Sequence, residues 1–92
     1  ACETGLGRVQ GGEGVVGLTQ AFQLAGANGV LVSLWKVDDA GTSIFMQALY
    51  KEAQNGKYRE AVQKVKRQFI SGVFGEQYRH PFYWAPFVYY GK

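Results

Sequence analysis

Two stretches of the chain have the composition of buried strands, and this small number limits what the chain can fold into. Residues 30–37 are rich in β-branched and aromatic side chains and lie between Gly29 and Asp38. Residues 84–90 are similar, but Pro86 interrupts them and predicts an edge or bulged strand. Two strands cannot form a parallel sheet that covers helices. We therefore expect the remaining strands to come from another part of the protein.

Helical periodicity accompanies these strands. Val15, Leu18, Phe22 and Ala25 fall three or four residues apart, which predicts a first helix that starts near residue 13 and is stopped by glycine at 26 and 29. A second helix is predicted to run to about residue 53, with an aspartate at 38 or 39 as its N-cap. A third is predicted from about residue 58 to 69. The order loop, helix, strand, helix, helix, strand indicates an α/β fold.

Composition excludes several classes of protein. With 92 residues, the chain forms one small domain at most, and its 47% hydrophobic content excludes disorder. No apolar run approaches the ~18 residues that a membrane span needs. The net charge of +3 arises mainly on one predicted helix face, so we expect no nucleic-acid partner. One cysteine and one histidine are too few for a metal site, and a lone thiol suits a cytoplasmic setting.

A glycine pattern near the start resembles a nucleotide-binding fingerprint. Gly12, Gly14 and Gly17 have the spacing G-x-G-x-x-G, and Asp38 follows about twenty residues later. A fingerprint of this kind needs a strand that leads into its first glycine, and the residues before Gly12 contain none. Nucleotide binding is therefore the less favoured interpretation, and tight turns with close packing explain the glycines better.

Cys2 and His80 are the two candidates for catalysis by residue type. A lone cysteine is usually a small buried hydrophobe, and as a nucleophile it needs a base and an oxyanion hole. His80 lies in HPFYWAPF, between an arginine and a proline, where a structural role is the simpler interpretation.

Three segments in order carry a resemblance to a known family: ACETGLG, GEGVVGLTQAFQLAGANGVLVSLWKVDD and HPFYWAPFVYYGK. Together they resemble the C-terminal half of a CHAT domain, the caspase-like peptidase domain often found after TPR repeats in bacteria. The resemblance covers residues 1–92 and implies a three-layer α/β/α sandwich with a mostly parallel sheet, of which this chain is an incomplete half. It also implies a preceding half of the domain and TPR or other repeats as partners, and no cofactor.

The resemblance implies a cysteine endopeptidase. Ala1-Cys2-Glu3-Thr4-Gly5 matches the family's nucleophile motif, so Cys2 is the implied nucleophile and its N–H an oxyanion donor. The family's catalytic histidine lies in the upstream half, whereas His80 matches a motif near the domain's end. These residues alone are therefore expected to be inactive. The alternative is a catalytically inactive caspase-like binding or scaffold module in bacterial signalling or defence.

A substrate-binding wall is also implied. In caspase-like enzymes the matching strand edge pairs with an extended peptide substrate, which assigns Ser33, Trp35 and Lys36 to substrate binding. Asp38 and Asp39 follow at once. One of them is expected to cap the second helix, and the other could favour a basic residue before the cut.

Overall fold

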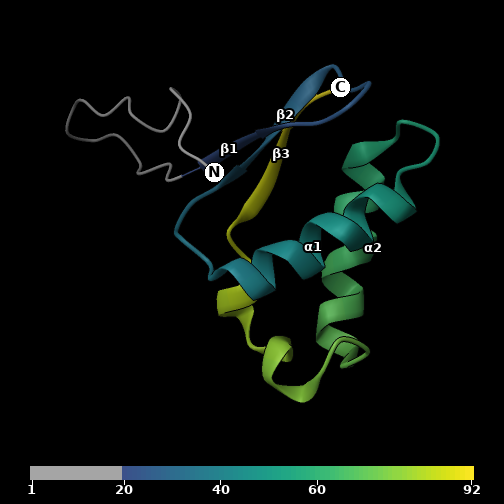
Figure 1. Cartoon of the computed structure of the whole chain (residues 1–92). Helices are drawn as coiled ribbons and strands as arrows, with labels where there is room; N and C mark the ends of the chain where they lie inside the picture. The colour runs from purple at the N-terminus through teal and green to yellow at the C-terminus, as the bar shows by residue number, and fades with distance from the viewer. Residues whose placement is uncertain (1–19) are drawn as a thin grey trace, which may run out of the picture. The chain divides into compact units, whose positions relative to one another are not determined.

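In the computed structural model, residues 20–92 are described, and they divide into two compact units. The sheet unit contains the described residues 20–36 and 86–92. The helical unit contains Val37–Ala85. Along the chain, the helices of the second unit are inserted between two strands of the first (Figure 1).

The sheet unit has three antiparallel strands: β1 (Gln20–Gln23), β2 (Gly29–Ser33) and β3 (Phe87–Gly91). Their spatial order is β1-β2-β3, so β2 has a neighbour on each side (Figure 1). One further backbone hydrogen bond, from Leu34 N to Pro86 O (3.1 Å), continues the pairing of β2 and β3. The mostly parallel sheet implied by the resemblance is therefore not what the described residues form.

Opposite residues of paired strands share a face, and the two faces of this sheet differ in burial. Leu31 lies opposite Tyr89 and Ser33 opposite Phe87, and all four are buried. Phe22 of β1 contributes to the same face, with its ring centroid 6.4 Å from that of Phe87. On the other face Val32 is buried, but Val30 and Val88 are only half-buried and Tyr90 is exposed. The alternation explains why the β-branched and aromatic residues of the two predicted strands form a sheet.

A tight turn joins β1 to β2. The N–H of Ala27 donates to the carbonyl of Leu24 (3.1 Å), which closes a four-residue turn. Gly26, the third residue of this turn, has a φ of 72°, a conformation that glycine adopts without steric cost. The glycine taken as a helix stop is thus the turn residue of a β-hairpin.

The first predicted helix is therefore wrong in its described part. Phe22 and Ala25 were two of its four apolar markers, but residues 20–23 are a strand and Ala25 lies in the turn. A short apolar segment fits strand and helix alike, and here pairing with β2 decides between them. The other two markers, Val15 and Leu18, lie outside the described residues.

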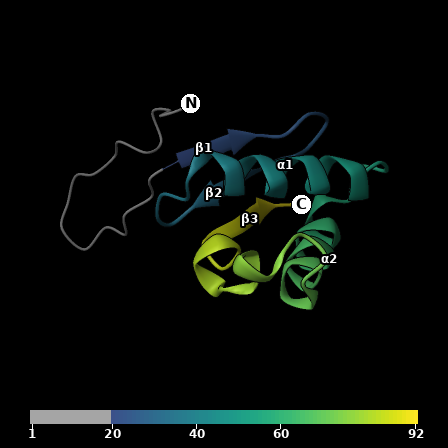
Figure 2. The same ribbon diagram turned by 60° about the horizontal axis from the view of Figure 1, so that its bottom comes forward.

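The two later helices form as predicted. They are α1 (Asp39–Glu52) and α2 (Tyr58–Ser71), which contact each other within the helical unit (Figure 2). A turn at Asn55-Gly56 separates them, and the N–H of Gly56 donates to Ala53 O (2.9 Å). The apolar stripe of α2 is buried, while most of its basic residues are exposed, as an amphipathic helix requires.

Phe69 of α2 is the centre of an aromatic cluster. Its ring centroid lies 5.6 Å from that of Phe45 in α1 and 4.9 Å from that of Phe74. The ring of Tyr78 approaches it edge-on at 6.4 Å. Phe69 and Phe45 are fully buried, so this cluster holds α1, α2 and the segment after α2 together.

The segment between α2 and β3 contains two short 3-10 helices, η2 (Glu76–Arg79) and η3 (Pro81–Tyr83). The last strand starts at Phe87, directly after Pro86, rather than at Trp84. Because proline has no N–H to donate, the strand begins beyond it, and β3 is an edge strand among the described strands, as predicted.

Replacing the central ring tests this core. We expect Phe69→Ala to lower the free energy of unfolding by about 3–5 kcal/mol, because it removes a buried ring and leaves a cavity. Ile70→Ala changes a side chain that is 44% exposed, so it should cost much less. Urea unfolding followed by tryptophan fluorescence measures both. Equal costs for the two variants would contradict the central role of Phe69.

Candidate functional site

The implied nucleophile lies outside the part of the chain that the structure describes. Cys2 and the glycines at 12, 14 and 17 all precede residue 20. Their roles therefore stay predictions. The structure does describe the five residues assigned to substrate binding, and their local environments differ.

Ser33 ends β2 and is fully buried. Its hydroxyl donates to the carbonyl oxygen of Trp35, which fixes the bend of the chain as it leaves the strand. Trp35 is 38% exposed and Lys36 is also exposed. These contacts bring Ser33 and Trp35 together and leave the indole at the surface.

The pairing of β2 limits how a peptide could bind here. An extended peptide adds to an exposed sheet edge. At Ser33 both edges of β2 are taken, by Gln20 of β1 and by Phe87 of β3. Any pairing of a substrate with this segment would therefore fall on the residues after β2, Trp35 and Lys36, for which the assignment stays a prediction.

Asp38 is the N-cap of α1, which confirms that one of the two aspartates caps the helix. Its Oδ1 accepts from the N–H of Gly41 (2.7 Å), and its backbone oxygen accepts from the N–H of Thr42 (3.0 Å). The carboxylate also lies at the positive end of the helix. Asp39 is the first residue of α1 and is exposed, so it is the aspartate that remains for a pocket role.

The N-terminus of α1 contains a constraint that periodicity did not reveal. A Cβ atom at Gly41 would lie 2.9 Å from Cδ1 of Tyr83 and 3.0 Å from the capping oxygen of Asp38. Thr42 Oγ1 donates to the carbonyl of Val37 (3.2 Å) and ties the helix to the preceding residue. The signal in the sequence was a glycine three residues after a capping aspartate, at a position where alanine would favour the helix more.

Of the five residues, three belong to one unit and two to the other. Ser33, Trp35 and Lys36 are in the sheet unit, and Asp38 and Asp39 are in the helical unit. The grouping of these five residues in one substrate site therefore stays a prediction.

His80, the only histidine, has a local structural partner. Its Nδ1 accepts from the N–H of Phe82 (3.1 Å), and its backbone oxygen accepts from the N–H of Tyr83 (3.0 Å). The side chain thereby caps η3, which begins at Pro81. This geometry explains why a histidine precedes proline here.

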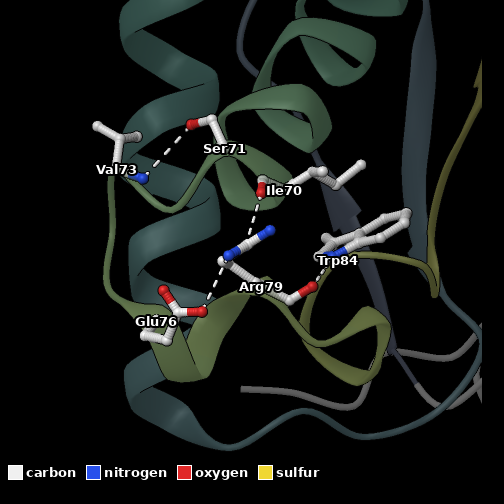
Figure 3. A network of polar contacts seen from close by, with 6 residues as sticks. All are labelled: Ile70, Ser71, Val73, Glu76, Arg79 and Trp84. Carbon is white, nitrogen blue, oxygen red and sulfur yellow. Dashed lines mark hydrogen bonds and ion pairs between the residues drawn. The ribbon is translucent and has the colours of Figure 1, made fainter.

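Arg79, next to His80, connects three parts of the helical unit (Figure 3). Its Nε donates to the carbonyl of Ile70 in α2 (2.9 Å), and its Nη1 pairs with Glu76 Oε2 (2.9 Å). The indole N–H of Trp84 donates to the carbonyl of Arg79 (3.0 Å). Arg79 and the HPFYW residues that follow it thus fasten the end of α2 to the segment that leads to β3.

Within residues 20–92, no helix is long and apolar enough to cross a bilayer. The same residues contain no group of three metal-ligating His, Cys, Asp or Glu side chains.

Comparison with known proteins places this chain in a family. A family model with the description "CHAT domain" matches residues 1–92 of this chain. Human tetratricopeptide repeat protein 28 is 37% identical over 80 residues, which are 87% of this chain and 3% of the relative. The mouse protein of that name is 36% identical over 80 residues, again 87% of this chain and 3% of the relative. No solved structure gives a significant match.

The described residues define a chain of the α/β class whose three-stranded sheet is interrupted by a helical insertion. With the match over its whole length, this chain belongs to the CHAT domain family. Its relatives are animal proteins named for tetratricopeptide repeats, so the association of the domain with such repeats holds, and the bacterial setting stays a prediction.

The two aspartates can be separated by their effects on stability. We expect Asp38→Ala to cost about 1 kcal/mol of unfolding free energy, since it leaves the first N–H groups of α1 without their acceptor. Asp38→Asn keeps an acceptor and should cost a few tenths. Asp39→Asn should also cost only a few tenths. Urea unfolding distinguishes these cases, and a larger cost at Asp39 than at Asp38 would overturn the assignment.

The role of Arg79 can be tested by separating its two contacts. Arg79→Lys keeps the charge but loses the fixed pair of N–H donors, so we expect a cost of about 1 kcal/mol in unfolding free energy. Glu76→Gln removes only an exposed ion pair and should cost less than ~0.5 kcal/mol. If Glu76→Gln costs as much as Arg79→Lys in thermal or urea unfolding, the bond to Ile70 is not the important one.

Proposed function

We propose that residues 1–92 are the C-terminal half of a caspase-like cysteine endopeptidase domain, a three-layer α/β/α sandwich completed by strands and helices of an upstream half. One observation carries the proposal: the CHAT family match begins at Ala1-Cys2-Glu3-Thr4-Gly5 and continues to residue 92. The matched range thus includes the nucleophile motif itself.

In the proposed mechanism, Sγ of Cys2 attacks the scissile carbonyl carbon of a protein substrate. A histidine of the upstream half takes the thiol proton and later gives it to the leaving amine. The backbone N–H of Cys2 donates to the developing oxyanion, which is where donors lower the barrier most. Water then hydrolyses the thioester and releases the acyl product with regeneration of the thiol.

The local role of His80 supports a base from elsewhere in the protein. Its Nδ1 already accepts from Phe82 N–H, and its position after η2 is fixed by the contacts of Arg79. A free thiol has a pKa near ~8.5, so without a histidine partner only a small fraction of Cys2 would be thiolate at neutral pH. These residues alone should therefore be inactive.

Substrate selection is proposed to involve Trp35, Lys36 and Asp39. The exposed Trp35 offers an apolar wall, and Lys36, which follows it, is also exposed. Asp39 is an exposed carboxylate and, unlike Asp38, it does not cap the helix. A carboxylate in the pocket would favour arginine or lysine before the cut.

The proposed partners are a protein substrate, the upstream half of the domain and tetratricopeptide repeats. The printed name of the relatives supports the repeats, and this chain spans only 3% of their length. A cytoplasmic location is proposed on the single cysteine of the chain.

A non-catalytic binding module is the second candidate, and the position of β2 favours it. At Ser33 both sides of β2 are occupied by β1 and β3, which leaves less of this strand for an extended substrate. A scaffold that contacts its partner through Trp35 and Lys36 would need no further pairing along the strand.

Labelling of Cys2 decides between the candidates. We expect the full-length protein to react with a peptidyl acyloxymethyl ketone ending in arginine at least ~10³ times faster than free cysteine does, because an activated thiolate attacks it. Cys2→Ala should abolish the labelling, and replacement of the upstream histidine by alanine should reduce it to the rate of free cysteine. Intact-mass spectrometry over time measures the rate.

His80→Ala is the matched control for this experiment. It removes the chain's own histidine but touches no residue proposed for chemistry, so the labelling rate should stay within ~2-fold of the unchanged protein. Labelling no faster than that of free cysteine would favour the binding module. A loss of labelling in His80→Ala, with the fold retained, would show that the base has been assigned wrongly.

A further inference from the structure

A groove within the helical unit is not used by the proposed chemistry. It has a volume of ≈ 490 Å³ and lies between one face of α1 and the segment that follows α2. Its lining residues are Ile44, Gln47, Ala48, Lys51, Glu52, Gln68, Val73 and Phe74. A groove of this size falls in the range of ~300–1,000 Å³ that protein ligand sites occupy.

The lining of the groove combines apolar and polar side chains. Ile44 and Ala48 lie one helical turn apart on α1, and Val73 and Phe74 come from the segment after α2. The other lining residues are two glutamines, one lysine and one glutamate. Such a combination of apolar side chains with a few polar groups is typical of a ligand site.

Val73 is the most exposed large hydrophobic side chain of the described residues, at 64%. Its backbone N–H donates to Ser71 Oγ (3.4 Å), and the N–H of Gly75 donates to Gly72 O (3.0 Å) across the same turn. Figure 3 shows the side chains of Val73 and Ile70 pointing to opposite sides. A hydrogen-bonded turn thus holds an apolar side chain at the surface, beside the groove, where burial by a partner would be favourable.

The lining contains one cation, Lys51, and one anion, Glu52, and only Glu52 forms an ion pair among the described residues. Glu52 Oε2 accepts from Gln68 Nε2 (2.9 Å), and its Oε1 pairs with Lys64 (3.5 Å). The hydrogen bond from Gln68, with the charge of Lys64, holds the pKa of Glu52 below its ordinary value of 4.5. Lys51 is exposed, and within residues 20–92 it forms no ion pair. The groove therefore carries one satisfied anion and one cation that is available to a partner.

We propose that this groove is a docking site for an acidic peptide segment, with an aliphatic or aromatic anchor against Ile44, Ala48 and Val73 and a carboxylate paired with Lys51. Charge complementarity selects an acidic rather than a basic partner, because Glu52 is already paired with Lys64 and Gln68, whereas Lys51 forms no ion pair among the described residues. The site is separate from Cys2 and does not depend on catalysis.

Titration with two peptides tests the proposal. The full chain, labelled with ¹⁵N, is titrated with acetyl-Glu-Asp-Leu-Phe-Asp-Glu amide and with the same peptide carrying lysine at its four acidic positions. We expect the acidic peptide to shift the amide signals of Ala48, Lys51 and Val73, and to bind about tenfold more tightly than the basic one.

Matched variants identify the groups responsible. Val73→Asp and Lys51→Glu should each weaken binding of the acidic peptide by about tenfold. Ile70→Asp and Lys57→Glu change exposed residues of the same types outside the groove, so they should change the dissociation constant less than ~2-fold. Circular dichroism confirms that each variant keeps its fold.

Three results would overturn the proposal. The first is equal or tighter binding of the basic peptide, and the second is shifts confined to residues outside the groove. The third is a concentration-dependent dimer that Val73→Asp disrupts, because a second copy of the chain would then be the occupant. Labelling of Cys2 is measured separately, so failure here leaves the proposed function untouched.

Discussion

The antiparallel pairing of β2 with β3 is the constraint on which the described structure depends. It joins Ser33 to Phe87, and the bond from Leu34 N to Pro86 O closes the sheet at the point where the helical insertion begins and ends. Pairing of residues so distant in the chain carries a large loop-closure cost, which local hydrogen bonds alone do not offset. The helical insertion itself must contribute to stability, and it does so through its own buried cluster around Phe69. The insertion therefore has a structural reason to carry a core of its own.

How much of this fold can be predicted depends on the range of the interactions. The α1 and α2 helices follow from a 3.6-residue apolar period and from the cap at Asp38, both of which are local. The direction of β3 is not local. A single crossover helix would return the chain to the start of β2 and give a parallel pair, whereas two successive helices lead out and back, which suits an antiparallel one. The sequence predicted both helices, but it did not predict that β3 would pair antiparallel with β2.

The first hairpin and the candidate sites show the same difference between what local and non-local interactions determine. Gly26 suits the end of a helix and the third position of a turn equally, and only the pairing of Phe22 with Leu31 decides which is formed. For the aspartates, residue type alone predicted that one would cap, and the geometry assigns this to Asp38. The sequence signal for the groove is weaker: it is the apolar pair at 73 and 74 between two glycines. This pair forms a groove only together with α1, whose lining residue Ile44 lies nearly thirty residues earlier in the sequence.

The groove and the carboxylate of Asp39 belong to the same helical unit, which has a consequence for how such a domain could be regulated. A partner in the groove would contact α1 on the face of Ile44 and Ala48, and α1 begins at the cap formed by Asp38 beside Asp39. Because a packed helix moves as a rigid element, any change in its position would reach the carboxylate proposed for substrate selection. Coupling of this kind requires the partner to bind one position of α1 more tightly than another, so it would be reciprocal between the groove and the substrate site.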